Sequence, residues 1–263
     1  MNIIAKMWLF AELCSHDKQD SGDHDSDPHD YIKDWIADHF NNHKDYLYFQ
    51  MSNNSDFAYI LELQDMILFV FRGTYGGVAW INNFSFSPLV NGYIHKGFFE
   101  SFEFFRPEID KYLKSSQTIF GKIFTSVNKP VFCIGHSRGG ILSQLCARHL
   151  AKNRHLSVCC INFGSPVGGT KKFRDEMNLL PIYNTRVVNG YDLVTRVFDD
   201  TLGRHAGNRF WLPQPRWHML FTWRKLMDHA YSSYTDALIK YSKKIKDQEA
   251  VDVLKEVKKR VNI

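Results

Sequence analysis

The chain has 263 residues, of which 44% are hydrophobic and 23% charged, and it carries a formal net charge of +5. This length and apolar content fit one domain with a single substantial core rather than several small domains. No apolar run is long enough to span a bilayer and no recognition motif accompanies the charge, so we expect neither a transmembrane segment nor a nucleic-acid partner.

Three regions are expected along the chain. Residues 1–50 are predicted to form a helical and acidic segment packed on a domain that spans 51–240, and residues 241–263 a basic C-terminal helix. The lysines of this last helix suit either a solvated face or peripheral contact with an anionic membrane or a lipid droplet, and the sequence leaves both open.

The acidic part of the first region lacks the pattern of a metal site. Counting from Asp23 puts Pro28 where a calcium-binding loop needs glycine. The scattered histidines also lack the spacing of zinc ligands. We therefore predict a solvated loop in this region and no bound metal.

The cysteines and the first apolar stretch indicate the cellular compartment in which the protein is expected. The five cysteines have no regular spacing, and a bridge between the adjacent Cys159 and Cys160 would be strained, so reduced thiols are expected. The apolar stretch at 7–13 is interrupted by Glu12 and precedes no small-residue cleavage site, which argues against a secretory signal. A cytoplasmic protein is the expectation, with export by a route that needs no signal peptide left open.

From residue 57 onward, short apolar runs alternate with helical patterns. The predicted strands are 57–63 and 66–72, which form a hairpin, followed by 131–134, 157–163, 185–188 and 209–212. The predicted helices are 97–113, 140–150, 171–177 and 229–241. This alternation predicts an α/β fold, with a mostly parallel sheet and helices on both of its faces. Chemistry in such a sheet collects at the carboxyl ends of the strands.

One strand end carries the motif of a nucleophilic serine. Gly135-His136-Ser137-Arg138-Gly139 is a G-x-S-x-G sequence directly after the strand at 131–134. The glycines suit a strained strand-to-helix turn in which a Cβ would clash, and His136 is expected to support the turn without a catalytic step. The backbone N–H of Arg138 then lies at a helix N-terminus, where it can stabilise an oxyanion.

Two further residues complete a triad in the expected chain order. Asp192 follows the strand at 185–188, and His229 follows the last core segment, which gives the order Ser, Asp, His of an α/β-hydrolase. We predict Ser137 as the nucleophile, His229 as the base and Asp192 as the residue that orients the imidazole. The competing residues are Asp199 or Asp200 for the acid and His205 or His218 for the base.

Five sequence blocks follow one another along the chain: Phe71-Arg72-Gly73-Thr74, His95-Lys96-Gly97-Phe98, the G-x-S-x-G turn, Phe163-Gly164-Ser165-Pro166, and the segments that carry Asp192 and His229. With these blocks the chain resembles the class 3 lipase family of α/β-hydrolases, from roughly the first hairpin to the final helix. Arg138 stands where the family usually has leucine. Only its backbone N–H is needed for the chemistry.

The resemblance implies an oxyanion hole and a lid. Thr74 resembles the family's second oxyanion donor, which would act together with Arg138. The segment 75–90, with Tyr75, Trp80 and Phe84, resembles a lid over the active site, and a packed loop is the alternative interpretation.

Taken together, the residues favour a serine carboxylic-ester hydrolase of acyl lipids that needs no cofactor. Triacylglycerol and phospholipid remain alternative substrates, although the basic character near Arg138, Lys96 and the C-terminal tail favours an anionic head group. A non-catalytic lipid-binding module and a lipid acyltransferase are the alternative functions, the latter because it shares the acyl-enzyme step.

Overall fold

The computed structural model describes residues 1–15, 47–52, 57–63, 66–73, 89–91, 93–119, 129–154, 156–196 and 203–261. The predicted acidic loop in the first region lies outside these ranges.

A seven-stranded sheet runs through the described part of the chain, in the order β1-β2-β3-β6-β7-β8-β9. Its strands are β1 (Leu47–Ser52), β2 (Phe57–Glu62), β3 (Ile67–Phe71), β6 (Val131–His136), β7 (Val158–Phe163), β8 (Ile182–Asn189) and β9 (Asn208–Leu212). The pairs β1–β2 and β2–β3 are antiparallel, and every pair from β3 to β9 is parallel. The predicted hairpin and the mostly parallel sheet are confirmed. Strand β1 was not expected.

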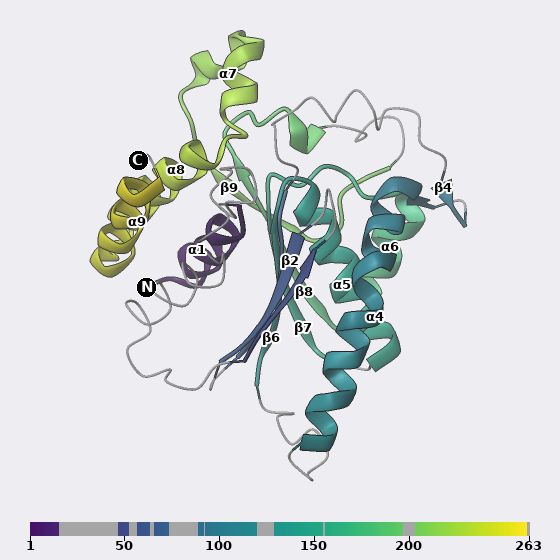
Figure 1. Ribbon diagram of the computed structural model, residues 1–263. Coiled ribbons are helices and arrows are strands. Elements are labelled where there is room, and N and C mark those ends of the chain that lie inside the picture. Colours follow the sequence, from purple (N-terminus) through teal and green to yellow (C-terminus); the bar gives the residue numbers. More distant parts are fainter. Residues whose placement is uncertain are drawn as a thin grey trace, which may run out of the picture.

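Helices cover both faces of the sheet (Figure 1). On one face lie α4 (Lys96–Ile119), α5 (Arg138–Arg154) and α6 (Lys171–Leu179), and on the other α1 (Ile3–Ser15), α8 (Tyr231–Lys244) and α9 (Gln248–Val261). A separate two-stranded sheet, β4 (Leu89–Val90) with β5 (Ile94–His95), precedes α4. The α/β fold expected from the sequence is therefore confirmed.

The C-terminal helices differ from the prediction in their bounds. The basic helix expected over 241–263 begins only at Gln248, because residues 241–244 belong to α8. The helix expected from His229 begins two residues later, at Tyr231, and a short helix, α7 (Thr222–Met227), precedes it. Asp228 and His229 form the turn between the two helices, and both side chains hydrogen-bond to other parts of the chain. His229 therefore projects from a turn and not from a regular helix.

Each sheet face buries its own core because side chains alternate along a strand. In β3, Leu68 and Val70 face the core beneath α1 and α8, whereas Ile67, Phe69 and Phe71 face the core beneath α4 and α5. All five side chains are buried. This two-sided burial explains why the strand appears in the sequence as a continuous apolar run rather than an alternating pattern.

The N-terminal helix is part of the core. Trp8 of α1 is fully buried, stacks on Tyr234 with ring centroids 5.2 Å apart, and donates its indole N–H to Thr235 Oγ1 at 2.9 Å. Its ring also meets His136 edge-on, with centroids 5.6 Å apart. Helix α1 therefore packs directly behind the G-x-S-x-G turn.

Within the described ranges no helix is long and apolar enough to cross a membrane. The four cysteines whose side chains are described, Cys133, Cys146, Cys159 and Cys160, are free thiols. The adjacent Cys159 and Cys160 are therefore not bridged, as expected from their spacing.

Candidate active site

The predicted nucleophile lies on a sharp strand-to-helix turn. Strand β6 ends at His136, helix α5 begins at Arg138, and Ser137 between them has φ of 55°. A Cβ at Gly135 would lie 2.1 Å from the Gly139 carbonyl oxygen, and one at Gly139 would lie 2.2 Å from the carbonyl oxygen of Phe71. Both glycines are therefore required by close backbone approach, which confirms the local reasoning from the sequence.

Arg138 contributes two different groups to this region. Its backbone N–H belongs to the first turn of α5, where the helix dipole favours negative charge. Its side chain is buried, and the guanidinium donates to Ser101 Oγ of α4. The side chain thus ties α5 to α4, which leaves the backbone as the part of Arg138 suited to an oxyanion.

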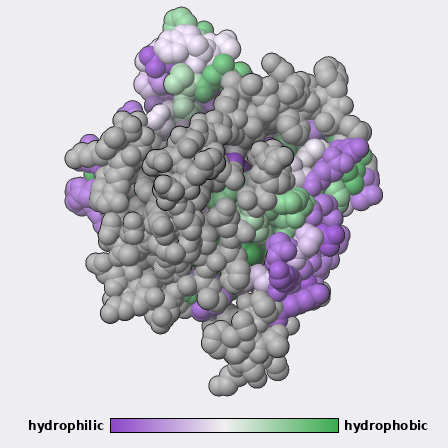
Figure 2. Space-filling model, in the orientation of Figure 1, coloured by the Kyte–Doolittle hydropathy of each residue, from purple (hydrophilic) through white to green (hydrophobic). Residues whose placement is uncertain are grey.

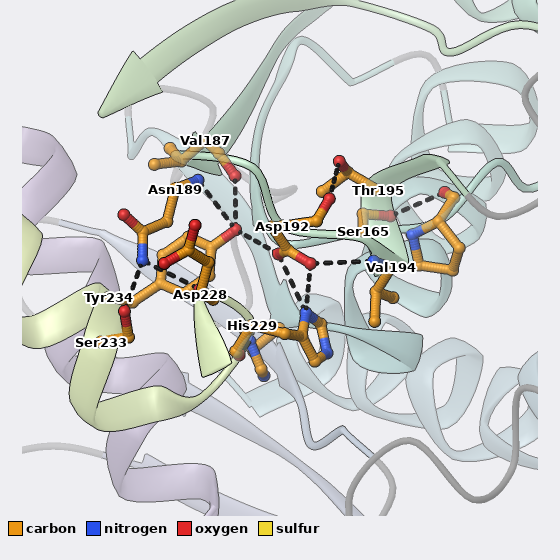
Figure 3. Close-up of polar contacts among 12 residues, drawn as sticks. Ser165, Val187, Asn189, Asp192, Val194, Thr195, Asp228, His229, Ser233 and Tyr234 are labelled. Atoms are coloured by element: carbon orange, nitrogen blue, oxygen red, sulfur yellow. Dashed lines mark hydrogen bonds and ion pairs between the residues drawn. The ribbon is translucent and has the colours of Figure 1, made fainter. Parts of the chain in front are cut away.

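Asp192 is held by donors on several sides (Figure 3). It follows β8 after a tight turn and is almost fully buried. Its carboxylate accepts a hydrogen bond from the Val194 backbone N–H at 2.9 Å and from the Tyr234 hydroxyl at 2.8 Å. Burial raises the pKa of Tyr234 well above its usual value, with the Asp192 charge adding to the effect, so the phenol stays a proton donor at neutral pH.

His229 is a further hydrogen-bond partner of the Asp192 carboxylate. Its Nδ1 lies 2.9 and 3.0 Å from the two Asp192 carboxylate oxygens, and the ring is buried. A carboxylate can only accept, so Nδ1 carries the proton when the imidazole is neutral. The lone pair is then on Nε2, at the opposite side of the ring, where it is available to take a proton.

Gly164 makes room for this pair. It follows β7 with φ of 58°, and a Cβ there would lie 2.9 Å from Asp192 Oδ2 and 3.0 Å from His229 Cε1. A side chain at this position would be strained and would also push the carboxylate and the imidazole apart. The end of β7 thus helps to form the site without contributing a reactive group.

His136 brings the turn that carries Ser137 next to His229. The two imidazole rings stack with centroids 4.6 Å apart, and His136 Nε2 donates to the His229 carbonyl oxygen at 3.0 Å. Ser137 is the next residue in the chain. Among the described contacts no hydrogen bond joins Ser137 to His229, and such bonds are often long in enzymes without substrate.

Both competing histidines have other partners. His218 Nδ1 lies 2.8 Å from Asp228 Oδ1, and His205 Nε2 donates to the Thr195 carbonyl oxygen at 2.6 Å. The structure therefore pairs Asp192 with His229 and not with either alternative. The competing acids Asp199 and Asp200 lie outside the described residues.

The predicted second oxyanion donor, Thr74, and the predicted lid residues Tyr75, Trp80 and Phe84 also lie outside the described residues. Gly73, next to Thr74, is described, and a Cβ there would lie 3.3 Å from the Ser137 Cβ. Strand β3 therefore ends beside Ser137. Among the described side chains, no cluster of three or more His, Cys, Asp or Glu could hold a metal ion.

Reasoning from the sequence missed three residues that support the site. Tyr234 binds Asp192, while Asp228 accepts from the Tyr191 backbone N–H at 2.9 Å and anchors His218. Asn189 donates to the Asp228 carbonyl oxygen at 2.9 Å. The one available signal was the helical spacing of Tyr231 and Tyr234 on the core face of α8, which predicts burial but not a hydrogen bond to Asp192.

Comparisons with known proteins identify a family and a set of similar folds. The sequence profile of the lipase (class 3) family matches residues 68–201, just over half of the chain. No curated protein matches in a comparison of sequences.

Among solved structures, the chain is similar to a lipase from Rhizopus microsporus var. chinensis (TM-score 0.63, 21% identity, covering 81% of this chain and 75% of that one). It is also similar to the Rhizomucor miehei triacylglyceride lipase (TM-score 0.62, 22% identity, 80% of each chain). A third similar structure is a triacylglycerol lipase whose catalytic centre is described as a serine protease triad (TM-score 0.62, 20% identity, 85% of this chain and 92% of that one). At these identities the likeness concerns the fold.

Proposed function

Because the chain belongs to the class 3 lipase family, we propose that it hydrolyses the carboxylic esters of acyl lipids through Ser137, His229 and Asp192. The observation that carries the proposal is the buried Asp192–His229 pair beside the nucleophile turn. A carboxylate bound to Nδ1 fixes the tautomer in which Nε2 can act as a base. Ser137, on its strained turn, is the hydroxyl next to this base.

The proposed reaction forms and then hydrolyses an acyl-enzyme. His229 Nε2 takes the proton of Ser137 Oγ as the oxygen attacks the ester carbonyl, and it returns that proton to the leaving alkoxide. Asp192 stabilises the imidazolium between these steps. The Arg138 N–H, with Thr74 as the expected second donor, stabilises the oxyanion. Water, activated by the same imidazole, then releases the acid.

For the substrate we propose a neutral acylglycerol. The sequence reasoning that favoured an anionic head group rested partly on Arg138, but the Arg138 guanidinium binds Ser101. Lys96 forms a 3.5 Å ion pair with Glu100 on the exposed side of α4. Two of the similar structures are described as triacylglyceride or triacylglycerol lipases, which supports the neutral substrate. Hydrolysis of triacylglycerol and phosphatidylcholine compared in mixed micelles tests this choice.

The catalytic proposal is tested by labelling with a fluorophosphonate, which reacts with activated serines. We expect labelling of the wild-type protein and of Ser232→Ala, a control that removes an exposed hydroxyl three residues beyond His229. We expect no labelling and no ester hydrolysis in Ser137→Ala. An unlabelled wild-type protein would favour the lipid-binding module, and an active Ser137→Ala variant would refute the assigned nucleophile.

A further inference from the structure

A short segment beside the candidate active site projects from the body of the molecule. Residues 213–227, here called the prong, join β9 to the turn that carries His229 and contain the 3-10 helix η4 (Arg216–Leu220) and helix α7. In Figure 1 α7 lies beyond the end of the sheet, and in Figure 2 it forms a projection with pale and green side chains beside purple ones. Neither helix of the prong contains a buried residue.

The prong exposes large apolar side chains. Its exposed members are Trp217, Met219, Leu220, Phe221, Trp223 and Met227, and Leu220 keeps 71% of its surface in water. Two of the six tryptophans of the chain lie in these 15 residues. A clustered apolar surface of this kind marks a contact with a partner or a lipid surface, because isolated exposed apolar residues are common but contiguous ones are not.

The charged residues of the prong and of the segment before it have a single sign, and Asp228, directly after the prong, is buried. From Gly203 to Met227, a fully described stretch, the sequence holds five cations and no aspartate or glutamate. The cations are Arg204, Arg209, Arg216, Arg224 and Lys225. Aromatic side chains together with arginine and lysine are typical of segments that lie in the interface of an anionic membrane.

The prong is internally ordered and attached to the site. The Arg224 guanidinium lies 4.0 Å from the centre of the Trp223 ring and 4.8 Å from that of Trp217. At its base, His218 binds Asp228 at 2.8 Å, and the Lys225 carbonyl oxygen accepts the Leu193 N–H at 3.2 Å. The exposed side chains therefore belong to a preformed structure that is joined to the loop after Asp192.

We propose that the prong is a docking device for the surface of an anionic phospholipid bilayer. Trp217, Leu220 and Trp223 enter the interfacial region, and Arg216 and Lys225 meet the phosphate head groups. A bilayer satisfies the apolar and the cationic side chains at the same time, whereas a protein partner would need an apolar groove with acidic walls. Docking would hold the His229 turn, two residues beyond Met227, against the lipid surface. The proposal concerns binding and does not depend on the proposed catalysis.

Binding is measured in the Ser137→Ala background, so that catalysis cannot alter the lipid. The probe is co-sedimentation with phosphatidylcholine vesicles that either contain or lack phosphatidylserine. We expect binding that requires phosphatidylserine and weakens with salt. Arg216→Gln with Lys225→Gln should reduce it about 25-fold, since each cation near an anionic surface contributes about fivefold. Leu220→Ser with Trp223→Ser should reduce it about tenfold or more.

The control variant carries Leu179→Ser and Tyr183→Ser. These two side chains are 87% and 76% exposed, but they lie at the end of α6 and the start of β8, away from the carboxyl end of the sheet. The control should bind as the parent does. Equal binding by the prong variants, no binding of the parent to anionic vesicles, or equal binding to pure phosphatidylcholine would each overturn the proposal.

A second measurement follows the fluorescence of the tryptophans instead of sedimentation. Brominated phosphatidylserine should quench tryptophan fluorescence of the parent protein, and quenching should be lost when the prong tryptophans are replaced. If the prong instead mediates self-association, sedimentation velocity will show a dimer that Leu220→Ser with Trp223→Ser dissociates, and vesicles will leave the fluorescence unchanged. That result would also overturn the proposal.

Discussion

At the scale of single residues, the site is defined by how the Asp192 carboxylate is surrounded. The His229 ring, the Val194 N–H and the Tyr234 hydroxyl all donate to it, so a buried charge has its hydrogen bonds satisfied. A carboxylate held in this way cannot turn away from the imidazole. The orientation of His229 is thus fixed by groups on the segment that follows β8, on α8 and on the turn before α8.

Replacing Tyr234 with phenylalanine tests this support. A hydrogen bond to a charged group contributes about 1.5–3 kcal/mol, and part of this should be lost from the transition state, so we expect kcat to fall about tenfold with little change in KM. Steady-state kinetics on a soluble ester gives both values. Tyr241→Phe, a change on the same helix farther from Asp192, is the control. An unchanged kcat in Tyr234→Phe would mean that the phenol only fills space.

The His136 ring is buried where it stacks on His229. Burial, and next the neighbouring His229, hold the pKa of His136 well below its usual value, so the ring is neutral when folded. Its Nε2–H then donates to the His229 carbonyl oxygen. In the unfolded chain the same residue takes up a proton near its ordinary pKa of about 6.5.

The difference between the pKa of His136 in the folded and in the unfolded chain predicts a loss of stability in acid. Below about pH 6.5 the unfolded chain binds a proton that folded His136 does not, so the free energy of unfolding should fall as the pH decreases toward the folded pKa. Above about pH 6.5 His136 should have no such effect. Urea titrations at about pH 7.5 and pH 5.5 measure the difference. His136→Gln, which keeps a donor but cannot titrate, should show a smaller difference, and an equal one would contradict the prediction.

At the scale of elements, the parts of the site that depend on local sequence could be predicted, and the parts that depend on packing between distant elements could not. The turn at Ser137 was predictable because a G-x-S-x-G sequence after an apolar strand carries its own geometric requirement, which the φ of Ser137 confirms. The role of Asp192 could be proposed from the sequence because the residue follows a predicted strand. The contribution of Tyr234 could not be predicted, since its hydrogen bond to Asp192 depends on how α8 packs against β8. No local sequence pattern indicates that contact, or the position of α1 behind the turn that carries Ser137.

Helix α1 provides a test at this scale. Trp8 packs on Tyr234 and His136, so Trp8→Ala should lower the free energy of unfolding by about 3–5 kcal/mol, a large part of the usual total. It should also reduce kcat, because both neighbours hold the site. Trp8→Phe keeps a ring but loses the bond to Thr235, and it should cost less. Denaturant unfolding and kinetics on the same samples check both effects, and a fully stable Trp8→Ala would contradict the packing argument.

At the scale of the whole molecule, the sheet joins two cores into one structure. The site lies at the carboxyl ends of β3, β6, β7 and β8, but His229 and Tyr234 come from the side of the sheet that α1, α8 and α9 cover. The sequence predicted the sheet and the helices that follow strands. It did not predict that the basic C-terminal helix buries Ala250, Val251 and Leu254 in the core on the α1 side of the sheet. The many lysines of this helix suggested a solvated or membrane-bound surface instead.

If the molecule unfolds as one unit, a change in α9 should destabilise the distant site. Leu254 is fully buried, so Leu254→Ala should lower the free energy of unfolding by about 2–5 kcal/mol, while Lys255→Ala, at the exposed neighbour, should stay within about 0.5 kcal/mol of the parent. Far-ultraviolet circular dichroism, near-ultraviolet circular dichroism and residual activity are followed in urea. In Leu254→Ala all three midpoints should move together, with activity unchanged before unfolding. Separate transitions would show that α9 and its core unfold independently of the sheet, so that the two sides are stabilised separately.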